Sequence, residues 1–94
     1  MASEYLGNIG DRITIEKAKC IMNIKKKALG GTDYRTTFID QKGNIVIWTT
    51  RISHDYKIGE EYYIRGTVRN HIPHGGTKYT SIFNCKIKPQ AERN

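Results

Sequence analysis

Hydrophobic and polar residues alternate along most of this chain, and alternation with a period of two is typical of β-strands rather than of helices. The first alternating run predicts a strand over 12–24, in which Ile13 and Ile15 share one side. The phase changes near Lys17-Ala18. Such a change indicates a β-bulge, which lets a long strand curl around a small barrel.

Two further strands are predicted over 34–40 and 44–50. Asp40 favours the start of a type I turn, and Gly43 can adopt the left-handed conformation of a G1 bulge, so a three-residue hairpin loop is expected. That loop pairs Ile39 with Ile45 and divides the hairpin into two faces. One face holds Thr37, Ile39, Ile45 and Ile47, and the other holds Tyr34, Thr36, Phe38, Val46 and Trp48.

A second hairpin is predicted from strands over 61–69 and 78–87, after a connector, 51–59, that is too short for more than about two turns of helix. The order is therefore a long curled strand, a basic loop at 25–31, a tight hairpin, a short connector and a second hairpin. This is the order of an all-β, five-stranded OB-fold barrel of Greek-key type whose helix between strands three and four is short or absent.

The length of 94 residues fits a single domain, for which we expect an ordered core of about 10–88. Pro89 should end strand pairing and leave 89–94 as a flexible tail. The N-terminal residues do not resemble a signal peptide, and no apolar run is long enough to span a membrane. We therefore expect a cytoplasmic protein.

Either face of the 34–50 hairpin could line the barrel. If the isoleucines fill it, then Tyr34, Phe38 and Trp48 lie outside, where aromatic rings flanked by cations suit single-stranded nucleic acid. In the alternative, Phe38 and Trp48 fill the core, and the segment around Tyr5, Leu6 and Ile9 covers Ile45 and Ile47.

Positive charge favours a polyanionic partner, because 16 Lys and Arg oppose nine Asp and Glu and give a net charge of +7. Lys25, Lys26 and Lys27 form either an electrostatic funnel or a solvated run, and Arg51 on the connector is a weaker candidate of the same kind. A basic surface can also serve solubility alone.

The tip of the second hairpin carries more charge than a turn needs. Arg69 and Lys78 could attract phosphate, and Tyr79 could stack on a base. His71 and His74 are interpreted as solvated residues or as further nucleic-acid contacts rather than as metal ligands, because Pro73 spoils the spacing.

No enzyme, metal or cofactor site is predicted. Cys20 and Cys85 form no CxxC pair, and both are expected to be buried free thiols. Ser53-His54-Asp55 is contiguous rather than converging in space, so it does not predict a catalytic triad. Abundant Ile, Lys, Asn and Tyr indicate an AT-rich genome, such as that of a low-GC bacterium or its phages.

Three runs resemble a known family, namely FIDQKGNIVIWTT, GEEYYIRGTVRNH and GGTKYTSIFNCKI. They are similar to OB-fold single-stranded-DNA-binding domains of the replication protein A type, and closer to small OB-fold proteins of replication modules in phages and mobile elements of low-GC bacteria. The resemblance covers roughly 10–88. It implies that the strand-three face that meets DNA carries Val46, Trp48 and Thr50, with Arg69 and Tyr79 also in contact.

The expected function is non-sequence-specific binding of single-stranded DNA in replication or recombination, by stacking on aromatic rings and by phosphate pairing with cations. An alternative is an OB-fold adaptor that docks on a primase-polymerase or a helicase. RNA binding is a third option, since the same stacking serves either polymer.

Overall fold

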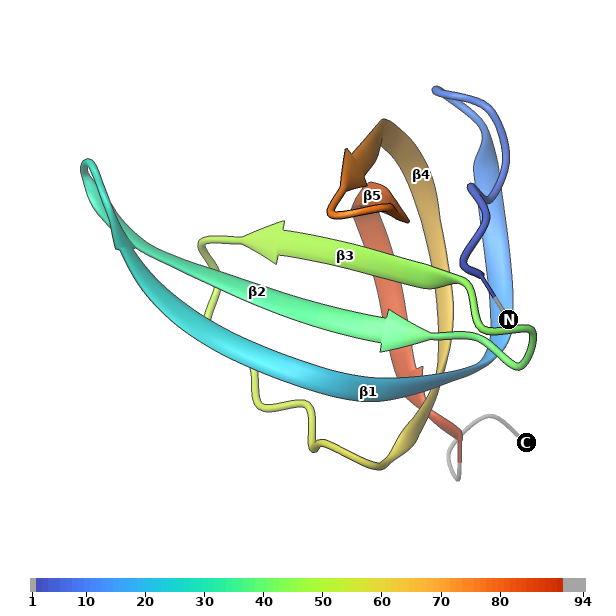
Figure 1. Ribbon diagram of the computed structural model, residues 1–94. Helices are drawn as coiled ribbons and strands as arrows, with labels where there is room; N and C mark the ends of the chain where they lie inside the picture. The colour runs from blue at the N-terminus through green and yellow to red at the C-terminus, as the bar shows by residue number, and fades with distance from the viewer. Residues whose placement is uncertain (1, 91–94) are drawn as a thin grey trace.

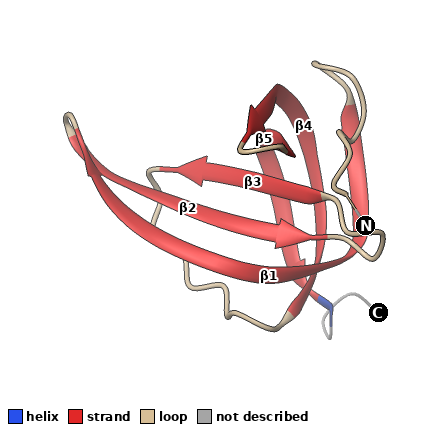
Figure 2. Ribbon diagram, viewed as in Figure 1, coloured by secondary structure: helices blue, strands red, loops and turns tan. Residues whose placement is uncertain are grey.

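The structure, a computed structural model, describes residues 2–90 and consists of five strands and their connections (Figure 1). Strands and loops account for nearly all of it, and no helix lies between the third and fourth strands (Figure 2). Within residues 2–90, no helix is long and apolar enough to cross a membrane. The strands are β1 (Arg12–Ala28), β2 (Gly31–Ile39), β3 (Ile45–Thr50), β4 (Glu61–His74) and β5 (Thr77–Pro89).

The five strands close into a barrel in the order β1-β2-β3-β5-β4, with β1 also pairing with β4. All pairs are antiparallel except β3 with β5, which run parallel. This arrangement is the OB-fold strand order, so the predicted fold class is confirmed.

Two irregularities allow β1 to serve both sides of the barrel. The register with β4 shifts between Ile15 and Ala18, at the predicted bulge, and the register with β2 shifts between Cys20 and Met22. Because a bulge increases local twist, the strand bends from one sheet into the other. Its second half then pairs with β2, and beyond Tyr34 the two strands continue past the end of β3 as a two-stranded arm, visible in Figure 1.

The β2–β3 turn has the predicted form. The Asp40 N–H donates to the Asn44 carbonyl at 2.9 Å, and Gly43 adopts a left-handed φ of 90°. The Asp40 carboxylate also accepts hydrogen bonds from the backbone N–H groups of Lys42 and Asn44. These contacts fix the register, and Ile39 pairs with Ile45 as expected.

The interior of the barrel holds the aromatic face of this hairpin, which overturns the first of the two packing alternatives. Phe38 and Val46 are fully buried, whereas Ile45 and Ile47 lie on the outer face. The Phe38 ring packs edge-on against Tyr62 of β4, with centroids 5.9 Å apart. The other core residues are Ile15, Ala18, Cys20, Ile64, Val68 and Ile82.

The connector between β3 and β4, residues 51–60, closes one end of the barrel in place of a helix. His54 stacks on Trp48, and Tyr56 packs edge-on against Tyr62. Asn23 of β1 donates a 2.7 Å hydrogen bond to the Tyr56 carbonyl, which ties the connector to the sheet. His54 and Tyr56 thus add aromatic rings to the barrel end, although the connector shows no strand-like alternation in the sequence.

The N-terminal segment, residues 2–10, crosses the barrel where β3 begins. The Ser3 hydroxyl donates to the Lys78 carbonyl and accepts from the Ile45 N–H. The Leu6 N–H donates to the Thr80 hydroxyl at 2.9 Å, and its side chain packs on the core. This segment therefore seals the barrel end opposite the connector, instead of covering Ile47 on the sheet face.

The β4–β5 hairpin is longer than predicted, because both strands continue to a tight turn at Gly75-Gly76. β5 has a bulge at Asn84-Cys85, opposite Gly66, where Asn84 adopts a left-handed φ of 53°. The bulge changes which residues of β5 face the barrel interior. Phe83 consequently points outward and Cys85 packs toward the core. A second shift, between Val68 and Asn70 of β4, places Arg69 opposite Ser81 and Ile82.

The predicted flexible tail, 89–94, falls largely outside the description. Pro89 is the last residue of β5 and is opposite Tyr62. Strand pairing ends there because proline has no backbone N–H to donate. Residues 91–94 lie outside the described residues.

Candidate nucleic-acid interface

A groove of about 430 Å³ runs across the outer face of the sheet formed by β1, β2, β3 and β5. Its lining is mostly apolar and includes no carboxylate. The lining residues are Ile21, Met22, Arg35, Thr37, Ile45, Ile47, Thr49, Ile72, His74, Tyr79 and Ser81.

Strand pairing determines which side chains form the groove floor. Thr37 pairs with Ile47, which pairs in turn with Ser81, and Ile45 pairs with Tyr79. Directly paired residues point to the same side of a sheet, so these side chains form a continuous strip across three strands. The lining also carries the rings of Tyr79 and His74.

Two hairpins wall the groove. On one side the β1–β2 arm forms an adjoining hollow of about 140 Å³, lined by Lys26 and Arg35 among others. On the other side, Ile72 and His74 reach the groove from the end of β4. Figure 1 shows the arm and the β4–β5 hairpin on either side of β3.

Tyr79 and Lys26 are the predicted binding residues that lie at this groove or its margin. Lys25 and Lys27 belong to β1 rather than to a flexible loop, because the arm pairs as far as Ala28 with Gly31. The Lys25 ammonium lies 5.9 Å from the centre of the Tyr34 ring, on the face of the arm opposite Lys26.

Five predicted contact residues belong to the inner face: Tyr34, Phe38, Val46, Trp48 and Thr50. The prediction that Phe38 and Val46 contact nucleic acid is wrong, because both are completely buried. Trp48 is half-buried beneath His54, and Tyr34 also approaches that ring, at 6.0 Å between centroids. Aromatic rings remove more apolar area from water than isoleucine, which favours this packing.

Thr50 belongs to the same inner face and accepts a hydrogen bond from the Ile52 N–H at the start of the connector. Its hydroxyl therefore stabilises the chain reversal after β3. The prediction that it contacts DNA has no support from its position.

Three predicted phosphate ligands already have partners within the protein. Lys78 forms a 3.0 Å ion pair with Glu4, and His71 stacks on Tyr5 with centroids 4.3 Å apart. Arg51 donates to the carbonyls of the β1–β2 turn and pairs with Asp33. Lys78 and His71 thus hold the N-terminal segment against the β4–β5 hairpin, and Arg51 holds the arm. These contacts within the protein account for the polar hairpin tip.

Arg69, the remaining predicted cation, lies on another surface. Its guanidinium sits over the Phe83 ring, 4.9 Å from the centroid, on the outer face of β4 and β5.

Arg35 is the main residue that the sequence prediction missed. It alternates with Thr37 and Ile39, so the correct choice of inner face would have placed it outside beside Ile47. Among residues 2–90 it forms no ion pair, and its charge is available to a ligand.

Burial governs the titration of the thiols. It raises the pKa of Cys85 from the usual 9.0 to about 12, although the charge of Arg12 acts in the opposite direction. Burial also raises the pKa of Cys20. Both are free thiols. Within the described residues, no three His, Cys, Asp or Glu side chains gather as a metal site.

Comparison with known proteins finds no matching family model, curated protein or solved structure. Function is therefore inferred from the chemistry of the site itself.

Proposed function

We propose that this protein binds single-stranded nucleic acid, DNA in the first place, in the groove between the β1–β2 arm and the β4–β5 hairpin. The observation that carries this proposal is the pairing of an aromatic ring with a cation, Tyr79 and Arg35, in the lining of one groove. They project from β5 and β2, which are two strands apart. Tyr79 is opposite Ile45 of β3 and Arg35 is opposite Thr49, so the two backbones are about 16 Å apart. A base can stack on the ring while a phosphate meets the guanidinium.

The rest of the groove supports binding without sequence specificity. Ile45, Ile47 and Met22 offer apolar contact to sugars and bases, and stacking tolerates any base because each has a π face. The net charge of +7 adds a long-range attraction to phosphate that every sequence shares.

The biological setting is proposed from the resemblance of the three sequence runs to replication-module proteins. It is the handling of exposed single strands in replication or recombination of a phage or mobile element. A binding protein is favoured over an enzyme because the groove lining has no carboxylate to serve as acid, base or metal ligand.

One observation favours a second candidate, an adaptor that docks on a replication enzyme such as a primase-polymerase or helicase. The groove is unusually aliphatic for a stacking surface, since Ile21, Met22 and Ile72 are all exposed large side chains. An extended apolar peptide could bind there instead, and RNA could replace DNA.

Fluorescence anisotropy of labelled oligothymidine, titrated at several salt concentrations, tests the proposal. Tyr79→Leu should weaken binding by about tenfold, as expected for the loss of one stacked base, while Tyr79→Phe should bind as the parent does. Arg35→Gln should lower the salt slope by about 0.7, the value for one lost phosphate contact on a single strand. Lys57→Gln, on the exposed connector, is the matched control for charge. Equal affinity in all four variants would exclude this groove.

A further inference from the structure

The outer face of β4 and β5 places two like charges directly opposite one another. Arg65 pairs directly with Lys86 across the two strands, and both side chains are exposed. Like charges placed opposite one another destabilise a sheet. The other cross-strand neighbour of Arg65 is Thr14, so neither direct neighbour neutralises its charge.

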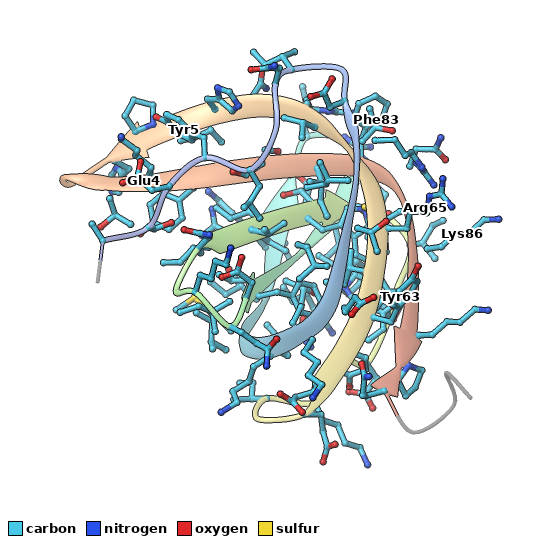
Figure 3. All side chains as sticks on the ribbon, turned by 90° about the vertical axis from the view of Figure 1, so that its right-hand side faces the viewer. Glu4, Tyr5, Tyr63, Arg65, Phe83 and Lys86 are labelled. Atoms are coloured by element: carbon cyan, nitrogen blue, oxygen red, sulfur yellow. The ribbon has the colours of Figure 1, made fainter. Side chains whose placement is uncertain are left out.

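An aromatic ring adjoins this pair. Phe83 is 37% exposed, although it is a large hydrophobic residue on a solvent-facing strand. Arg69 lies over its ring at 4.9 Å, and Thr67 pairs with Phe83 just beyond the Arg65–Lys86 pair. Figure 3 shows Tyr63, Arg65, Phe83 and Lys86 projecting from β4 and β5 away from the barrel interior. The basic β4–β5 face is defined here as Tyr63, Arg65, Arg69, Phe83, Lys86 and Lys88.

This face is continuous with the groove through β5. Tyr79, Ser81 and Phe83 occupy alternate positions of that strand, between the inward side chains Thr80 and Ile82. The Tyr79 and Phe83 backbones are therefore about 13 Å apart along one outer edge of the strand. A chain that leaves the groove at Tyr79 and follows β5 reaches the Phe83–Arg69 stack and then the Arg65–Lys86 pair.

We propose that the bound single strand does not end at the groove but continues along β5, and that the basic β4–β5 face holds its sugar–phosphate backbone. This inference rests on the proposed function and extends its site. Arg65 and Lys86 together bind phosphate, which relieves their mutual repulsion, and the Arg69–Phe83 stack provides a flat surface for a base.

The chemistry of the face favours nucleic acid over an acidic peptide as the occupant. The Asp and Glu side chains of an acidic peptide would satisfy the cations, but they offer no flat ring to place against the Arg69–Phe83 stack. A nucleic acid strand supplies both an anionic backbone and π faces, as the groove at the other end of β5 also requires.

The test compares two lengths of labelled oligothymidine, about six and about 16 nucleotides, which lie within the range of site sizes for one OB fold. Arg65→Gln/Lys86→Gln removes two charges from the face. Lys57→Glu on the connector changes the net charge by the same amount and is the matched control. All three positions are exposed, so circular dichroism should show each variant folded.

We expect the double variant to bind the longer oligomer about tenfold more weakly than the parent, with its salt slope reduced by about 1.4 for two lost phosphate contacts. Its affinity for the shorter oligomer should differ from that of the control by less than about twofold. Phe83→Leu should also weaken only the longer complex.

A double variant that binds both lengths as the control does, while Arg35→Gln still weakens binding, would overturn the extended path and leave the groove proposal intact. A parent protein that binds neither oligomer even at low salt would reject both proposals. Tight binding of the face to polyglutamate, without any length-dependent loss on oligothymidine, would assign it to an acidic protein and overturn the inference.

Discussion

The imidazole of His54 stacks on the indole of Trp48, with ring centroids 4.8 Å apart and planes inclined by 19°. The same imidazole lies 2.7 Å from the Thr36 hydroxyl through Nε2, so the connector is fixed to the inner face of β2 and β3. The position that a base would occupy over the indole is therefore filled by the protein itself. Trp48 belongs to the closure of the barrel, and the groove lies on the other side of the sheet.

Trp48 fluorescence should respond to the connector and not to nucleic acid. Saturation with oligothymidine should leave the emission almost unchanged, because no base stacks on the indole. His54→Ala should alter the emission, since it removes the stacked ring. Strong quenching by oligothymidine in the parent protein, retained in Tyr79→Leu, would show that the indole face is the binding surface.

Substitutions on the inner face of the β2–β3 hairpin should lower stability, whereas substitutions on its outer face should mainly weaken binding. Phe38→Ala should lower the free energy of unfolding by about 3–5 kcal/mol, because it empties a fully buried site. Ile47→Ala should cost less than about 1.5 kcal/mol, since the side chain is only partly buried, yet weaken oligothymidine binding several-fold.

Urea denaturation and anisotropy on the same two proteins measure both quantities. If Ile47→Ala lost several kcal/mol of stability and Phe38→Ala lost little, the assignment of inner and outer faces would be reversed.

Gly66 should resist substitution because of the bulge across from it. A Cβ at this position would lie 2.9 Å from the Cys85 sulfur and 3.3 Å from the Ile82 Cδ1 atom. Gly66→Ala should therefore cost about 1–3 kcal/mol through overpacking. Adding Cys85→Ala should recover part of that loss, and thermal unfolding of the single and double variants measures it. A double variant no more stable than Gly66→Ala would contradict this account.

The sequence predicts much of this fold because its local signals are strong. Asp40 and Gly43 specify the turn that pairs Ile39 with Ile45, and the phase change near Lys17-Ala18 marks the bulge. These signals involve only a few neighbouring residues, so they can be recognised in the sequence without knowledge of the tertiary structure.

The choice of inner face was harder, because both faces of the hairpin are apolar. The decisive contacts come from Tyr56 on an irregular connector and from Tyr62 on a distant strand, which surround Phe38. The alternation of hydrophobic and polar residues in the sequence gives no sign of this packing. The alternative that puts the isoleucines inside hides Arg35 and places Trp48 among the binding residues.

Alkaline pH should destabilise the protein through its buried thiols. The pKa of Cys85 rises from 9.0 in a free thiol to about 12, so its contribution to stability is complete below pH 9 and is lost as pH rises through 12. Over that interval the unfolded chain ionises first, and stability falls by up to about 1.4 kcal/mol per pH unit for this group. Burial raises the pKa values of Cys20 and Tyr56 in the same direction.

Urea denaturation between pH 8 and pH 11 should thus give a shallower decline for Cys85→Ala than for the parent. The slopes are compared rather than the absolute values, because the substitution also leaves a small void. Identical slopes would show that this thiol ionises as readily in the folded protein as in the unfolded chain.

A methyl NMR spectrum of isoleucine-labelled protein, titrated with oligothymidine, shows whether nucleic acid binds the aliphatic outer face of β2, β3 and β5. We expect the methyl signals of Ile45, Ile47 and Ile72 to shift in proportion to binding, while those of Ile64 and Ile82 in the core stay in place. Binding that leaves the three groove methyls unmoved would contradict binding at this face.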